Sequence, residues 1–180
     1  MKIVALSVIG GIAAIIFILY VTVKTKTTGL NDYEPFKSLI GKTFTLQRDT
    51  YLFDDEDSFD KIPDFPFTLV DELHPQWSYY QEGKVLPQIK ITEMMALPKG
   101  VTLTVEKAVQ YTSGVSGYSY PTLFGTISYR GQTYKVVYHW GERDIDKSYE
   151  NTDKYWTFCQ APWQERPDTS YYALPTAKFW

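Results

Sequence analysis

The chain has very few of the residues that usually carry chemistry: its 180 residues include one cysteine, Cys159, and two histidines, His74 and His139. A single cysteine excludes an internal disulfide and leaves the redox compartment open. A structural zinc site would need all three residues and a carboxylate in one place, and no paired spacing favours this. We therefore predict no metal ion and no cofactor.

Catalytic motifs are also missing. Cys159 could act as a nucleophile only if folding brought a histidine beside it, and its apolar neighbours Phe158 and Ala161 favour a small core residue instead. Ser116 lies in Gly114-Val-Ser-Gly117, where the second glycine comes one residue too early for a nucleophile elbow. We expect a non-catalytic protein. A cysteine-dependent hydrolase is the rival from a different class.

Basic residues do not outnumber acidic ones in this chain. After residue 26 the chain carries 21 acidic and 15 basic residues, a formal charge of −6. Phosphate binding needs a basic stripe, so the composition argues against nucleic acid and favours a basic partner. The densest acidic run is Asp54, Asp55, Glu56 and Asp57. It lacks the glycine and the spacing of a calcium loop, which leaves a solvated loop or a contact with a cationic partner.

No charged residue occurs between Ile3 and Val23. These 21 residues would form a helix of roughly 31 Å, close to the apolar thickness of a bilayer. They predict an uncleaved, single-pass transmembrane helix that contacts lipid, within an anchor spanning residues 1–26. A cleaved signal peptide and a buried helix are the alternatives, and the signal peptide lacks a small-residue cleavage site. The predicted location is the cytoplasmic (inner) membrane, with the rest of the chain on the periplasmic or extracellular side.

Residues 27–41 are expected to form a tether and a short helix, and residues 42–180 a β-rich globular domain. Within this domain, Val101–Val105 alternates cleanly between apolar and polar residues. The clearest hairpin joins Leu123–Tyr129 to Thr133–Trp140 through a short loop containing Gly131. An acidic loop is expected over residues 54–66. Six to eight short strands predict a mainly β fold, a small antiparallel barrel or sandwich.

The stretch from Ile89 to Trp140 resembles bacterial Src-homology-3-like barrels. The likeness consists of Ile89-Lys-Ile-Thr92, the turn Leu97-Pro-Lys-Gly100 before the strand Val101–Val105, and the tight hairpin around Gly131. It implies a β-barrel and an extracytoplasmic binding role. It covers less than a third of the chain and transfers no functional residue. The acidic loop and the aromatic tail depart from the compact pattern of that family.

Aromatic residues are abundant, at 17% of the chain, and many fall in predicted loops or in the C-terminal tail. Large aromatics outside strands are candidate contact residues, because they bury much area with little loss of rotamer freedom. The alternative is that the tail packs on the core. The residues that we expect to contact a partner are Asp54, Asp55, Glu56, Asp57, Trp77, Tyr118, Tyr120, Trp163 and Trp180.

Together these features predict a non-catalytic, membrane-anchored binding protein of the cell envelope, which recognises a protein partner through its loops and tail. An immunity protein that neutralises a secreted toxin is one version, and a scaffold subunit of an envelope complex is another. The sequence leaves the oligomeric state and the identity of the partner open.

Overall fold

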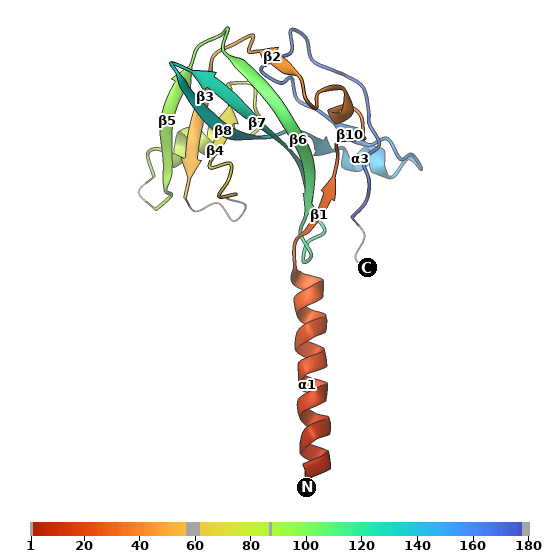
Figure 1. Ribbon diagram of the computed structural model, residues 1–180. Coiled ribbons are helices and arrows are strands. Elements are labelled where there is room, and N and C mark those ends of the chain that lie inside the picture. Colours follow the sequence, from red (N-terminus) through yellow and green to blue (C-terminus); the bar gives the residue numbers. More distant parts are fainter. Residues whose placement is uncertain (1, 57–61, 87, 178–180) are drawn as a thin grey trace.

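A computed structural model describes residues 2–56, 62–86 and 88–177, and within helix α1 the side chains of residues 11, 12 and 14–23. The chain is mainly β (Figure 1). Its helical elements are α1 (Lys2–Val23), η1 (Phe36–Ser38), α2 (Trp77–Gly83) and α3 (Ile145–Ser148). Its strands are β1 (Lys26–Gly29), β2 (Thr43–Thr45), β3 (Thr50–Asp55), β4 (Phe67–Val70), β5 (Ile91–Leu97), β6 (Thr102–Thr112), β7 (Ser119–Tyr129), β8 (Gln132–His139), β9 (Glu142–Arg143) and β10 (Trp156–Thr157).

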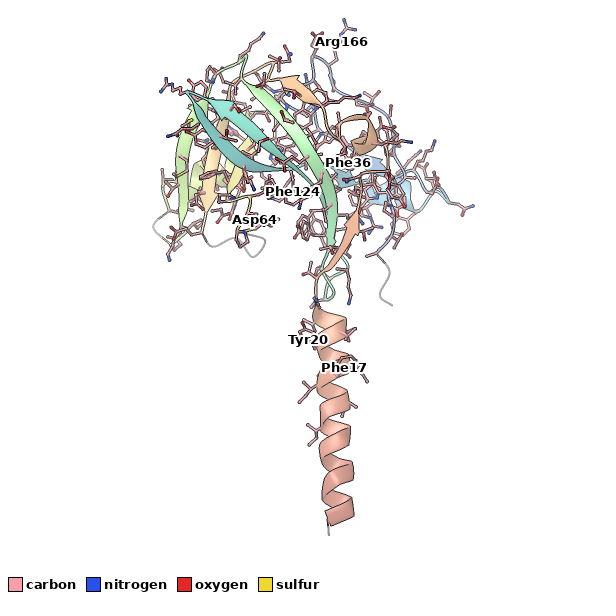
Figure 2. The ribbon with its side chains drawn as sticks, viewed as in Figure 1. Phe17, Tyr20, Phe36, Asp64, Phe124 and Arg166 are labelled. Atoms are coloured by element: carbon pink, nitrogen blue, oxygen red, sulfur yellow. The ribbon has the colours of Figure 1, made fainter. Side chains whose placement is uncertain are left out.

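Helix α1 projects away from the sheet as a straight rod (Figure 1). Described side chains such as Ile15, Phe17 and Leu19 are more than half exposed, and Phe17 and Tyr20 can be seen on the rod in Figure 2. Across the described part of the chain, no helix has both the length and the apolar character that crossing a membrane requires. The prediction of a transmembrane helix over Ile3–Val23, with its single-pass and signal-anchor assignment, is corrected accordingly.

The main sheet has eight strands in the order β1-β6-β7-β8-β4-β3-β5, and β2 pairs with β6 beside this path. All pairs are antiparallel except β4 with β8. The polar residues that follow α1, expected to be a tether, form β1 against the end of β6. The sheet curves strongly (Figure 1), and bulges interrupt the register of β3 and of β6.

The predicted closed barrel or sandwich is wrong. Among the described residues, no pairing joins edge strand β5 to β1 or β6, so the large sheet stays open. The second sheet contains only β9 and β10, which is too small to face the first as a layer. One apolar face of the large sheet is covered instead by η1, by β10 and by the mostly irregular chain that follows it to Leu174 (Figure 1).

This covering explains much of the aromatic surplus. Phe36 of η1 packs edge-on against Trp140 and Phe158, with ring centroids 5.8 and 5.5 Å apart. Trp163 packs against Trp140 at 5.5 Å. Backbone bonds hold the segment in place, since the amide of Gln47 donates to the Pro162 carbonyl at 2.7 Å. For the described residues, the tail therefore packs on the core.

The opposite face of the sheet is also apolar. Leu123 belongs to the main core, whereas its neighbour Phe124 packs with Phe65 and Val137 in a separate cluster. Adjacent strand residues point to opposite faces, so these clusters lie on the two sides of the sheet. Figure 2 labels one residue of each side, Phe36 and Phe124. Helix α2 covers part of the second face, where Tyr80 packs on Phe53 at 4.8 Å between ring centroids.

Candidate binding site

A cavity of about 700 Å³ opens between α2, the start of β7 and the end of β8. This volume lies within the range typical of ligand sites. Its walls come from segments far apart in the sequence: Asp55 ends β3, Tyr79 and Tyr80 lie on α2, Tyr118 and Tyr120 lie at the start of β7, and Phe158 belongs to the C-terminal segment. Folding thus gathers an aromatic wall at one end of the sheet.

Helix α2 places the tyrosines of one wall. Pro75 lies in the turn before it, one residue ahead of the N-cap Gln76. The amide of Gln76 donates to Nδ1 of His74 at 3.1 Å. Tyr80 turns into the sheet and is buried, and burial raises its pKa to about 12. Tyr79, 45% exposed, turns toward the cavity instead.

The opposite wall is a row of stacked tyrosines on the β6–β7 hairpin. Tyr111 and Tyr120 stack with ring centroids 5.6 Å apart, and Tyr120 stacks on Tyr118 at 6.1 Å. The hydroxyls of Thr112 and Ser119 are hydrogen-bonded at 2.8 Å between the strands and hold this end of the hairpin together. Tyr118 is 64% exposed, so one aromatic face is available to a partner.

Both histidines line the cavity, and each has a structural contact. Because Nδ1 of His74 accepts a bond, its Nε2 carries the proton and donates to the carbonyl of His139 at 2.7 Å. Burial lowers the pKa of His74, which keeps the ring neutral. Nδ1 of His139 lies 3.0 Å from the hydroxyl of Thr122. His74 therefore serves to join α2 to the end of β8.

Cys159 reaches the cavity wall as a thiol and not as a thiolate. Burial raises its pKa to about 11. Its Sγ lies 3.9 Å from the hydroxyl of Tyr138, and its carbonyl accepts from Trp140 Nε1 at 2.7 Å. A nucleophilic cysteine needs a lowered pKa and an adjacent base. Both ring nitrogens of His74 bond to backbone groups, so His74 is not placed to act as that base.

Asp55 is the unusual polar residue of the site. Only 6% of it is exposed. Its Oδ2 accepts from the Tyr79 hydroxyl at 3.2 Å, whereas its Oδ1 is buried without a hydrogen-bond partner among the described residues. A buried carboxylate oxygen left unpaired costs more than the roughly 1–3 kcal/mol of a neutral group, so it requires an explanation.

The cavity is also acidic as a whole. Glu142 adds a second, exposed carboxylate to its lining. No lysine or arginine is present among the described lining residues. Considering the same part of the chain, no group of three or more histidine, cysteine, aspartate or glutamate residues is arranged to hold a metal ion.

The structure brings three of the predicted contact residues together at the cavity: Asp55, Tyr118 and Tyr120. Asp54 is half-buried on β3, and Glu56 is exposed, 4.0 Å from Lys90. Two of the predicted residues, Asp57 and Trp180, lie outside the described residues.

Two predicted aromatic contacts lie elsewhere. Trp77 is half-buried and packs on Tyr51, with ring centroids 5.2 Å apart. Trp163 is 8% exposed and belongs to the core beside Tyr138 and Trp140. Among the lining residues, His74 and Glu142 were not foreseen as part of a site. The proline after His74 was the only local signal that a helix starts here.

The fold and the cavity define a mainly β protein with an aromatic, acidic cavity at one end of its large sheet. Compared with protein-family models, with curated proteins and with solved structures, the chain matches none. The likeness to Src-homology-3-like barrels stays a prediction.

Proposed function

We propose that this chain is a non-catalytic binding protein that recognises a protein partner through the aromatic cavity between α2 and the start of β7. The observation that carries the proposal is the pairing of a buried carboxylate, Asp55, with exposed aromatic faces at one concave site. Aromatic side chains in and around a pocket are the usual anchors of a protein interface. A partner segment inserted here would bury Tyr118, which is exposed in the free chain.

Charge favours a partner with a basic segment. The chain after residue 26 has a formal charge of −6, and the described cavity lining contains acidic but no basic side chains. Complementary charge speeds encounter and disfavours wrong partners. The immunity role and the scaffold role are both versions of such binding, and the identity of the partner distinguishes them.

Site-specific cross-linking tests the proposal. The photoreactive residue p-benzoylphenylalanine is placed at position 118 in the full chain, and cells are irradiated. Tyr149 provides the matched control, because it is a tyrosine with 83% exposure that does not line the cavity. We expect a protein adduct at position 118 that is absent at position 149.

The adduct then has to be shown to depend on the cavity. The partner is identified by mass spectrometry and purified, and its affinity is measured for the wild-type chain and for Tyr118→Ser. Loss of an anchoring aromatic should weaken binding by at least about tenfold. No adduct at position 118, equal adducts at both positions, or an unchanged affinity for Tyr118→Ser would overturn the proposal.

A further inference from the structure

We infer that the cavity receives the guanidinium group of an arginine side chain and that Asp55 is the carboxylate that binds it. This inference rests on the proposed function, because it names the group by which the partner is recognised. It depends on three features of the site: the unpaired oxygen of Asp55, the stacked tyrosines, and the lack of a basic residue in the described lining.

The first step concerns the missing hydrogen bond. Asp55 is 94% buried at the end of β3, and its backbone is fixed by the pairing of Asp55 with Ile91 of β5. Its Oδ1 has no partner among the described residues, while Oδ2 holds a single bond. An arginine fork donates two parallel N–H bonds and would satisfy both oxygens.

The second step concerns access. Oδ1 is shielded from solvent in the free chain, so the side chains that cover it have to shift when a ligand enters. The bond from the Tyr79 hydroxyl to Oδ2 is 3.2 Å long, whereas O–H···O bonds are usually about 2.7–2.8 Å. A long, weak bond is readily exchanged for a charge-assisted one.

The third step selects guanidinium over other cations. Tyr118 and Tyr120 stack with their planes 25° apart and offer an aromatic face at the cavity mouth. A planar guanidinium stacks on such a face while its edge donates two parallel bonds to a carboxylate, whereas an ammonium has neither the planar face nor the bidentate fork. Glu142 at the rim would attract the approaching charge.

The test uses two small probes on the full chain, N-acetylarginine amide and the neutral isostere N-acetylcitrulline amide. Binding is followed by the chemical shifts of backbone amides. We expect the arginine probe to bind at least tenfold more tightly than the citrulline probe, with the largest shifts around Asp55 and Tyr118. Equal binding of the two probes would overturn the inference.

Two variants locate the site. Asp55→Asn removes the charge and keeps the shape, and it should weaken binding of the arginine probe at least tenfold. Glu56→Gln is the matched control, since it removes the same charge from the next residue, which is exposed, and it should change binding less than twofold. Should Asp55→Asn fail to fold, Tyr118→Ala decides the matter, because this exposed residue can be truncated safely and should weaken the probe several-fold. Unchanged binding in either cavity variant contradicts the inference.

The probe experiment and the cross-linking experiment fail separately. A protein partner that depends on Tyr118, combined with no arginine-probe binding, leaves the proposed function standing and refutes the guanidinium site. Probe binding at Asp55 without any protein adduct at position 118 refutes the proposed function and leaves the guanidinium site standing.

Discussion

The Arg48→Met variant tests how the C-terminal segment is held to the sheet. Arg48 lies between β2 and β3, and its Nε donates to Asp71 Oδ2. Its Nη2 donates to the carbonyls of Gln160 and Ala161, each at 2.7 Å. One guanidinium therefore joins the bend before β3, the end of β4 and the segment that covers the core.

The magnitude follows from the burial of Asp71. Its side chain is 0% exposed, whereas that of Arg48 is 22% exposed. Removing one partner of a buried ion pair leaves an uncompensated charge and costs about 3–5 kcal/mol. We expect Arg48→Met to lower the free energy of unfolding by this amount at pH 7.5. Urea unfolding of the full chain measures it, with the fluorescence of the tryptophans as the signal.

The pH dependence gives a second check. Burial raises the pKa of Asp71, although the neighbouring Arg48 lowers it. A carboxyl whose folded pKa lies above its unfolded value contributes stability at low pH that is lost as the pH rises through the folded pKa. Removing Arg48 raises that pKa further, so the variant should recover part of its lost stability on acidification toward pH 4.5.

Arg166→Met is the control for this experiment, because Arg166 is exposed at the periphery (Figure 2). It should change stability by less than about 0.5 kcal/mol. If Arg48→Met costs less than about 1 kcal/mol, or if its cost does not depend on pH, the ion pair does not hold the segment and the reasoning is refuted.

Three further outcomes are expected. Since burial raises the pKa of Cys159 to about 11, iodoacetamide at pH 8 should alkylate it at least about 100-fold more slowly than free cysteine; fast alkylation would show an activated thiol. Burial lowers the pKa of His74, so wild-type stability should fall as the pH drops below about 6.5, and His74→Gln should flatten that fall in urea unfolding at pH 7.5 and pH 5. Gly125→Ala would place Cβ 2.4 Å from the Thr104 carbonyl oxygen and should cost about 1–3 kcal/mol; a neutral effect would show that β6 can move away.

Local pattern was enough to predict the hairpin of β7 and β8. Its register closes with Tyr129 opposite Gln132, and the turn residues Arg130 and Gly131 both have positive φ, as a tight two-residue hairpin requires. Gly131 was the local signal. The short helix expected within residues 27–41 proved to be η1 with turns on both sides.

Long-range pairing could not be predicted in this way. The turn Leu97-Pro-Lys-Gly100 exists, yet β5 and β6 on its two sides do not pair with each other. β5 joins β3, whereas β6 joins β7, β1 and β2. Alternation fixes which face a residue occupies, not which strand lies beside it. The prediction of a closed barrel failed at this point.

In the candidate site, too, local pattern predicts some features and long-range packing decides the others. Asp55 was predicted as a contact in a solvated acidic loop, but β3 continues through it, and the alternation that buries Phe53 buries Asp55 as well. Extending the predicted strand two residues beyond Phe53 would have predicted that Asp55 is buried. No such signal distinguishes Trp163, which is buried in the core, from Tyr118, which is exposed, because the difference arises from how the C-terminal segment crosses the sheet.

How firmly the cavity side chains are held in the free chain affects how tightly a ligand could bind there. The pairing of β3 with β5 fixes the backbone of Asp55, and the pairing of β7 with β6 fixes that of Tyr120. Both residues would therefore lose little conformational entropy when a ligand binds. Helix α2, in contrast, has no side-chain hydrogen bond at its N-terminal cap, and its exposed Tyr79 holds Asp55 by one long bond. Under the proposed function, this fixed acidic and aromatic wall would bind a ligand without rearrangement of the sheet. Binding of this kind would make no demand on the chemistry of Cys159.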